Sequence, residues 1–211
     1  MNLNPTPELV SSLYWITLVA VIVSSASGVL IAGLKKFDLF GVIIIAVATG
    51  LGGGSLRDML LDRDVFWVHD QVFFIASIGS AVFIFITARF IVISHRFFLI
   101  PDAAGLATFS IAGTLASIMM GTPWLIASFM GVITGTMGGV FRDILSNEPP
   151  LVFHSPLYAT VSWLGSLFFI GLLQFSVDVT LAAIISGASI FIARLLALYF
   201  KINLPAFRFK S

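Results

Sequence analysis

The sequence predicts an all-α membrane protein with seven transmembrane helices, arranged as two inverted three-helix repeats and a seventh helix. Of its 211 residues, 59% are hydrophobic and only 10% are charged, whereas a soluble domain carries about 25% charged residues. The apolar residues form runs that are long enough to cross a bilayer. A glycine-rich motif ending in Arg-Asp occurs twice, in two of these runs.

Composition also excludes several classes of protein. A formal net charge of +1 and the absence of a basic stripe argue against a nucleic-acid partner. The chain has no cysteine, so disulfides and thiolate metal sites are impossible. The histidines, His69, His95 and His154, fall at expected helix ends without the closely spaced partner of a zinc site. We therefore expect no cofactor.

The predicted spans follow from run length, because a bilayer core of about 30 Å requires about 20 apolar residues per helix. Charged or turn-forming residues separate the runs. The spans are 9–34, 38–61, 71–93, 97–120, 123–146, 156–175 and 178–200. The first run is too long for a signal-peptide core and no basic residue precedes it, so we expect it to be retained. The whole chain, 1–211, then forms one membrane domain.

The basic residues predict the orientation. With seven alternating spans, one side carries Lys35, Lys36, Arg89, His95, Arg96, Arg142, Arg194, Lys201, Arg208 and Lys210. The other side carries only Arg57 and Arg63. The positive-inside bias makes the rich side cytoplasmic. We therefore expect an N-terminus outside and a C-terminus inside, in the plasma membrane or bacterial inner membrane.

An internal repeat is the most specific feature of the sequence. The stretch GLGGGSLRDML, from Gly50, matches GTMGGVFRDIL, from Gly135, without gaps at an offset of 85 residues. The same offset pairs Gly28 with Gly113 and His69 with His154. The recurrence of Gly-Gly-x-x-Arg-Asp at an equivalent place in two spans indicates that one half of the chain is a duplicate of the other. Because each repeat, 9–93 and 97–175, holds three spans, the second copy must be inverted in the bilayer.

The glycines of the motif admit two interpretations. They are Gly52, Gly53 and Gly54 in the second span, and Gly138 and Gly139 in the fifth. Small residues let neighbouring membrane helices approach closely. However, three successive glycines point in different directions around a helix. We therefore expect a kink or unwound turn in both spans, facing protein or water.

An unwound turn would free carbonyl oxygens, which are suitable ligands for a monovalent cation. We expect such a cation near Gly53, Gly54, Gly138 and Gly139. Nearby hydroxyls that could add oxygen ligands belong to Thr49, Ser55, Thr134 and Thr136. The alternative is that each hydroxyl bonds to its own helix backbone. No charged residue lies within the central turns flanking the glycines, which mildly favours conduction over proton-coupled transport.

The two Arg-Asp pairs are candidates for a gating or charge network. Arg57 and Asp58, like Arg142 and Asp143, are sequence neighbours, and neighbours on a helix do not face each other. We therefore expect each charge to have a partner elsewhere, with Asp102 as the candidate partner of Arg142. Charges within the membrane are costly and are associated with function.

At these residues the chain resembles the prokaryotic branch of the trimeric intracellular cation channel family. The segments KKFDLFGV and PDAAGLATFSIAG support the resemblance, which covers nearly the whole chain. It implies a homotrimer whose protomers each hold a potassium-permeable pore between the glycine-kinked second and fifth helices. The chain is also similar to a bacterial group labelled glycine transporters. Met137 departs from the pattern because it replaces the first glycine of the second triplet.

The leading hypothesis is thus a passive cation channel in the lipid bilayer, with potassium or sodium as the permeant ion. The alternative is a secondary transporter of a small zwitterion such as glycine. A transporter would hold a carboxylate with freed amides, whereas a channel would hold a cation with carbonyls and hydroxyls. An intramembrane enzyme is not expected, because the sequence offers no credible pair of nucleophile and base.

Overall fold

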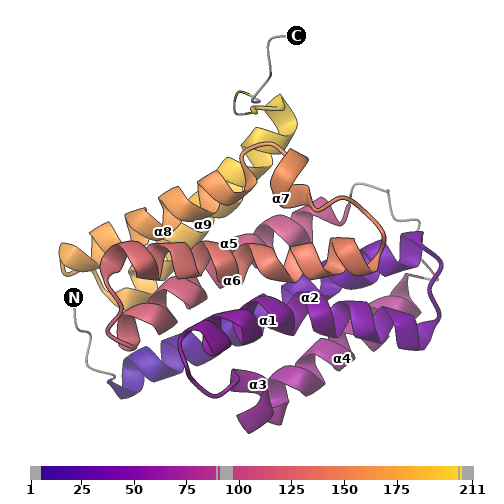
Figure 1. Cartoon of the computed structure of the whole chain (residues 1–211), viewed down its shortest axis with the longest axis horizontal. Coiled ribbons are helices and arrows are strands. Elements are labelled where there is room, and N and C mark those ends of the chain that lie inside the picture. The colour runs from indigo at the N-terminus through magenta and orange to yellow at the C-terminus, as the bar shows by residue number, and fades with distance from the viewer. Residues whose placement is uncertain (1–5, 89, 91–96, 204, 206–211) are drawn as a thin grey trace.

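The computed structural model describes residues 6–88, 90, 97–203 and 205. Within these residues the chain forms nine helices (Figure 1), which are α1 (Pro7–Leu34), α2 (Leu39–Leu60), α3 (Phe66–His69), α4 (Gln71–Thr87), α5 (Leu99–Met119), α6 (Trp124–Leu145), α7 (Leu151–His154), α8 (Tyr158–Gln174) and α9 (Val179–Phe200). Of these, α1, α2, α5, α6 and α9 are long and apolar enough to cross a membrane, and α4 and α8 are shorter apolar helices.

The prediction of an all-helical membrane protein with seven substantial helices is confirmed. Each substantial helix begins within two residues of its predicted span. The clearest difference is α4, which ends at Thr87, while residues 91–93 of the predicted span lie outside the described part. Among the basic residues used for orientation, Arg89, His95, Arg96, Arg208 and Lys210 also lie outside the described part.

Polar side chains fix the start of several helices. Thr6 accepts a hydrogen bond from the amide of the third residue of α1 (3.3 Å), and Pro7 follows it. Asp38, Asp70 and Asp178 cap α2, α4 and α9 in the same way, at 2.7, 2.9 and 3.0 Å. An N-cap oxygen satisfies a backbone amide that the helix itself leaves without a partner. These caps explain why the apolar runs begin as helices at these residues.

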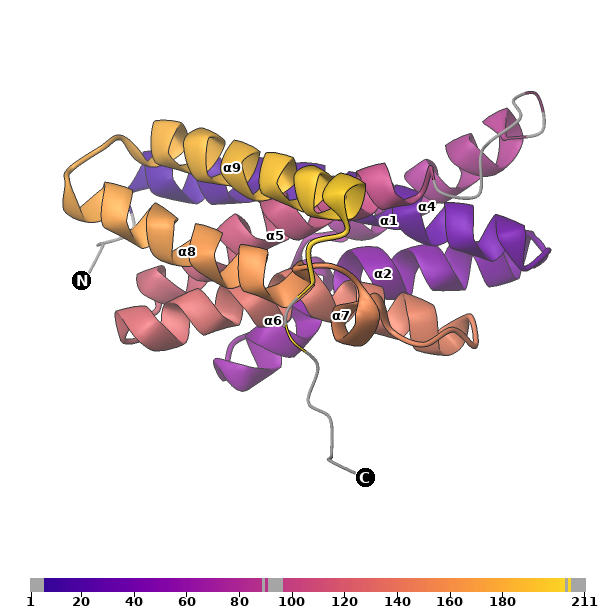
Figure 2. The ribbon, with the colours of Figure 1, turned by 90° about the horizontal axis from the view of Figure 1, so that it is seen from above.

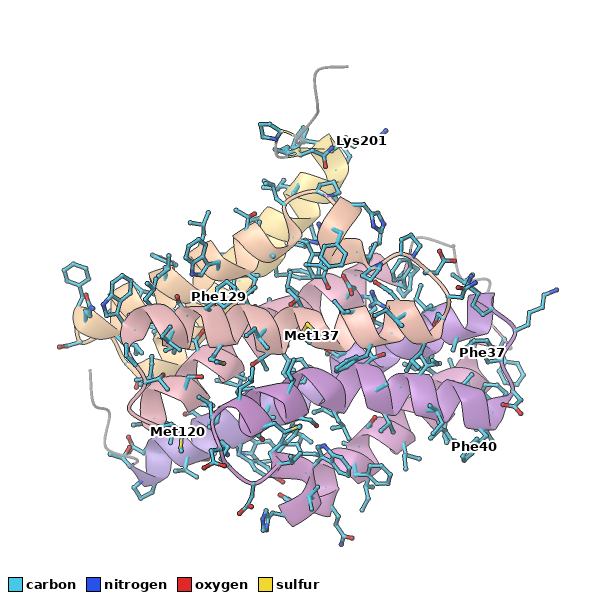
Figure 3. The ribbon with its side chains drawn as sticks, viewed as in Figure 1. Phe37, Phe40, Met120, Phe129, Met137 and Lys201 are labelled. Atoms are coloured by element: carbon cyan, nitrogen blue, oxygen red, sulfur yellow. The ribbon has the colours of Figure 1, made fainter. Side chains whose placement is uncertain are left out.

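The helices repeat with the offset seen in the sequence. The offset of 85 residues takes α3 (Phe66–His69) onto α7 (Leu151–His154) without a shift in either bound. It also relates α1, α2 and α4 to α5, α6 and α8. Phe37 and Phe40, around the start of α2, lie at the opposite end of the bundle from Met120, at the end of α5 (Figure 3). The two copies therefore run in opposite directions.

The four helices α1, α2, α5 and α6 form the centre of the bundle. α1 packs against α2 and α5, and α6 packs against α2 and α5. α4 covers the first repeat by contacting α1 and α2, while α8 contacts α5 and α6. α9 stands outside the duplication and packs along α8 and α5 (Figure 2). The pairing of α2 with α6 brings the two glycine motifs together.

Candidate functional site

The glycine motifs form the closest contact between α2 and α6. A β-carbon added at Gly53 would overlap the carbonyl oxygen of Thr134, and one added at Gly138 would overlap the carbonyl oxygen of Thr49. Both helices run as continuous α-helix through the motifs. The expected unwound turn is therefore wrong: the backbone groups stay within the helix, and glycine serves close approach.

The three successive glycines of α2 each meet a different neighbour. An added β-carbon would strike the ring of Phe141 at Gly52, the backbone of Thr134 at Gly53, and the ring of Phe66 at Gly54. Their different directions around the helix, which seemed to favour an unwound turn, instead correspond to three packed surfaces. Met137, in the place of the first glycine in the second repeat, is half-buried midway along α6 (Figure 3).

All four hydroxyls of the predicted site donate to the carbonyl four residues earlier. The bonds run from Thr49 to Ile45 (2.6 Å), Ser55 to Leu51 (2.8 Å), Thr134 to Met130 (2.6 Å) and Thr136 to Val132 (2.8 Å). Such a bond uses the hydroxyl hydrogen and leaves the oxygen lone pairs available. Of the four residues, Thr49 also lines a cavity at the centre of the protein.

This central cavity lies beside the crossing of α2 and α6 and has a volume of about 10 Å³. Its polar lining comes from Ser24, Ser27, Thr49, Asp102, Arg142 and Tyr158, and Gly135, Gly138 and Gly139 complete one wall. A volume of this size accommodates about one water molecule. The centre of the protein is therefore polar, and in this conformation it is too narrow for a continuous file of water.

A buried arginine organises one wall of the cavity. The Arg142 guanidinium donates to Asp102 Oδ1 (2.6 Å), to Asp143 Oδ1 (2.8 Å) and to the hydroxyl of Ser27. The Tyr158 hydroxyl donates to Asp102 Oδ1 (3.1 Å). We call these five residues the Arg142 cluster. The predicted pairing of Arg142 with Asp102 is confirmed, and it brings together α1, α5, α6 and α8.

The Arg142 cluster corrects one expectation from the sequence. Arg142 is fully buried, and Asp102 is 5% exposed. Both line the central cavity next to Gly139. The expectation that no charge flanks the glycines is therefore wrong, because Asp102 approaches from a different helix. Within the described residues, Asp102 Oδ2 and Arg142 Nη2 have no hydrogen-bond partner.

Each arginine of the motif also pairs with the aspartate that follows it. Arg57 Nε and Nη2 lie 2.8 Å from Asp58 Oδ1, and Arg142 Nε lies 2.8 Å from Asp143 Oδ1. The expectation that sequence neighbours cannot pair is wrong here. The rule concerns side chains that extend outward from the helix, whereas a long arginine side chain reaches a neighbour on the same turn.

The two aspartates have a second role that the sequence analysis missed. Asp58 Oδ2 accepts the amide of Phe66, and Asp143 Oδ2 accepts the amide of Leu151, each at 2.9 Å. These amides begin α3 and α7. One carboxylate thus neutralises an arginine and anchors a short helix, which explains why Arg-Asp occurs in both repeats. The shared spacing of eight residues was the signal available in the sequence.

The surroundings of the two arginines differ although their motifs match. The offset of 85 places Ala112, Thr17 and Phe73 where the Arg142 cluster has Ser27, Asp102 and Tyr158. Within the described residues Arg57 pairs with one carboxylate, that of Asp58. Its partner Asp58 is shared with Arg63, whose Nε lies 3.3 Å from Asp58 Oδ1, and its guanidinium lies 5.7 Å from the ring centroid of Phe66.

A larger cleft lies beyond the Arg142 cluster. This outer cleft has a volume of about 270 Å³, and Lys35, Asp143, Glu148 and His154 supply its polar lining. Lys35 Nζ and Glu148 Oε1 are 2.5 Å apart, with each side chain partly exposed. Arg142 lines the central cavity, and its partner Asp143 lines the outer cleft. The Arg142–Asp143 ion pair therefore lies between the two spaces.

The histidines form no metal centre in the described part of the chain. No group of three or more His, Cys, Asp or Glu side chains there has the arrangement of a metal site. His69 ends α3 and lies 3.1 Å from Asp64, whereas His154 ends α7 and lines the outer cleft. The polar oxygens of the central cavity are thus the candidate ligands for a cation.

Comparison with known proteins gives consistent matches over most of the chain. A family described as glycine transporter matches residues 14–89 and 99–174. The UPF0126 inner membrane protein YadS of Escherichia coli K12 is 34% identical over 197 residues, covering 92% of this chain and 95% of that protein. A UPF0126 membrane protein of Vibrio cholerae is 36% identical, covering 93% and 83%.

Solved structures match as well. A trimeric intracellular cation channel orthologue from Rhodobacter sphaeroides is 33% identical, with a TM-score of 0.85, over 90% of this chain and 98% of that one. A prokaryotic channel of the same kind in 0.5 M KCl is 27% identical, with a TM-score of 0.83, over 91% and 98%.

Proposed function

The chain belongs to the membrane-protein family described as glycine transporter, and we propose that it is a channel for monovalent cations with a pathway in each protomer. The observation that carries the proposal is the polar central cavity at the crossing of α2 and α6, where two inverted copies meet. Sites for small ions in inverted-repeat membrane proteins characteristically lie at this place. The similarity to the Rhodobacter sphaeroides channel supports the same function.

The proposed pathway runs from the outer cleft past Arg142 and between α2 and α6 to the Arg57 end of the protein. Lone pairs on Thr49, assisted by Ser55, Thr134 and Thr136, would replace part of the hydration shell of a cation. The cation would pass close to the glycines of the motifs, which are Gly52, Gly53, Gly54, Gly138 and Gly139. At Gly53 and Gly138 the two backbones are in contact, so passage of a cation would require α2 and α6 to separate at this point.

The charge network would act as the gate. Arg142 repels a cation from the central cavity while it faces that space, although Asp102 and Asp143 neutralise it. Withdrawal of Arg142 would widen the cavity and leave the Asp102 carboxylate facing the pathway, where it attracts a cation. Arg57 and Asp58 would form the corresponding constriction at the other end. The structure, with its cavity of about 10 Å³, then corresponds to a closed conformation.

The test is electrical recording from purified protein in a planar bilayer under a KCl gradient. We expect unitary currents whose reversal potential lies close to the Nernst potential of potassium. Replacing potassium by sodium on one side measures the selectivity between them. A reversal potential that follows chloride, or an absence of unitary current from correctly assembled protein, would refute the channel.

Transport of glycine is the second candidate, favoured by the family description and by one structural observation. The outer cleft combines an amine at Lys35 with carboxylates at Glu148 and Asp143, and a zwitterion needs both charges. Proteoliposomes that accumulate labelled glycine when an ion gradient is imposed, while bilayers show no unitary current, would favour this candidate over the channel.

We further propose that the protein acts as a homotrimer in the inner or plasma membrane. The similar Rhodobacter sphaeroides protein is described as a trimeric channel, and the similar Escherichia coli protein as an inner membrane protein. Native mass spectrometry in detergent tests the stoichiometry. A monomer that conducts in bilayers would refute the requirement for a trimer.

A further inference from the structure

The helix outside the duplication carries a buried charge. Arg194, near the end of α9, is fully buried and has no counterpart in either repeat. Its guanidinium donates to the Ser155 hydroxyl (2.7 Å) and to the carbonyl oxygen of Pro156. The same group lies 4.4 Å from the ring centroid of Tyr158. A buried charge in a membrane protein is costly and is associated with function. The position of Arg194 therefore requires an explanation.

The segment that Arg194 holds leads into α8. Its last residue, Leu157, has φ 34° and ψ 52°, a left-handed conformation that leucine rarely adopts. In the first repeat the corresponding helix, α4, begins differently: Asp70, the counterpart of Ser155, caps it directly. The second repeat lacks such a side-chain cap at α8, and Arg194 binds the segment instead.

Tyr158, the first residue of α8, connects this segment to the Arg142 cluster. Its ring lies against Arg194, and its hydroxyl donates to Asp102 Oδ1, the oxygen that also accepts from Arg142. In the first repeat the equivalent residue is Phe73, which has no hydroxyl. The hydroxyl is therefore specific to the second repeat, whose α8 and α5 form most of the contact with α9.

We propose that α9 positions the gate: Arg194 fixes the start of α8 and the ring of Tyr158, so that the tyrosine hydroxyl holds Asp102 against Arg142. Arg194 is a positioning residue, because it does not line the central cavity. When this support is lost, Asp102 is free to move, Arg142 is held less firmly, and the central cavity opens more often. The effect on ion flow rests on the proposed function, whereas the effect on cavity opening does not.

The absence of native cysteine allows a test that does not depend on current. Ser24 lines the central cavity and is outside the Arg142 cluster. In a Ser24→Cys background, the rate of modification by a small cationic thiosulfonate measures how often the cavity opens. We expect Arg194→Gln and Tyr158→Phe each to raise this rate about tenfold, the factor that corresponds to losing one hydrogen bond to a charged group.

The double variant should modify no faster than the faster single variant, because both changes act through one hydroxyl. Ser186→Ala is the matched control, since Ser186 is buried on the same helix and has no hydrogen-bond partner within the described residues. Its rate should equal that of the background. Tyr158→Phe keeps the ring and restores the residue found in the first repeat, so it serves where Arg194→Gln fails to fold.

Bilayer recordings complete the experiment. We expect Arg194→Gln to raise the open probability at fixed voltage without changing the unitary conductance. Raised modification rates without any current in wild type would support the positioning role and refute the channel. Unchanged modification rates in folded Tyr158→Phe, or rates that add independently in the double variant, would overturn the proposal whatever the current.

Discussion

Alanine at the contact between α2 and α6 gives the most direct test of how these helices pack. Gly53→Ala and Gly138→Ala each place a methyl group on a backbone carbonyl of the opposite helix, which cannot rotate away. Overpacking of this kind costs about 1–3 kcal/mol, and the higher helix propensity of alanine offsets about 1 kcal/mol. We therefore expect each variant to be destabilised by a net amount of up to about 2 kcal/mol.

The chain provides matched controls for this experiment. Gly33 in α1 and Gly171 in α8 are also helical, but within the described residues an added β-carbon would meet nothing within 4 Å. Gly33→Ala and Gly171→Ala should leave the melting temperature unchanged or raise it. The assay is thermal unfolding of the four variants in one detergent, followed by the oligomeric mass. Equal melting of all four would refute the close contact and with it the present placement of α2 against α6.

Three further predictions follow from the charges. Arg142→Ala should destabilise the protein by about 3–5 kcal/mol, because it leaves the buried carboxylates of Asp102 and Asp143 without their arginine. Asp102→Asn should cost less, because Asp143 still neutralises Arg142, and a double-mutant cycle should show coupling between the two changes; independent effects would refute the pairing. Lys35→Gln should change the free energy of unfolding by less than about 1 kcal/mol, because the pair with Glu148 is partly exposed. A loss of stability that is greater at high salt than at low salt would contradict this. Reporter fusions should place the N-terminus outside and the C-terminus inside; ends on the same side would refute the orientation.

The spans and the duplication were predictable because their signals are local in the sequence. Hydrophobic run length fixes the substantial helices to within a few residues, except at the end of α4. The pairing of Arg142 with Asp102 was also predictable, because a membrane charge needs a partner and Asp102 falls on the same predicted side of the membrane. These inferences need only the length of a helix and the cost of burying a charge.

The role of the glycines was not predictable by the same means. A run of glycines has the same spacing whether it unwinds a helix or admits three neighbours, and the neighbours of Gly52, Gly53 and Gly54 come from two other helices. The short helices α3 and α7 were missed because four residues are too few to show a period. Their anchors, Asp58 and Asp143, become visible only when side-chain contacts are known.

The comparison of the two repeats indicates how a duplicated protein acquires two unequal ends. Matched packing is retained at the centre: Ser25 bonds to Ser77 (2.9 Å) in the first repeat, and Ser110 bonds to Ser162 (2.6 Å) at the equivalent place. Divergence is concentrated around the arginines. One end has two arginines around a single carboxylate, and the other has one arginine between two carboxylates.

This difference has a physical consequence for any charged species that crosses the protein. At one end Arg57 and Arg63 share the carboxylate of Asp58, whereas next to the central cavity Arg142 lies between the carboxylates of Asp102 and Asp143. A strictly symmetric duplication would present the same barrier from both sides of the membrane. The substitution of Thr17 by Asp102 at equivalent positions removes that equality, because a buried carboxylate lowers the energy of a nearby cation at one end only. The seventh helix reinforces the same end, since Arg194 contacts Tyr158 and the first repeat has no corresponding helix.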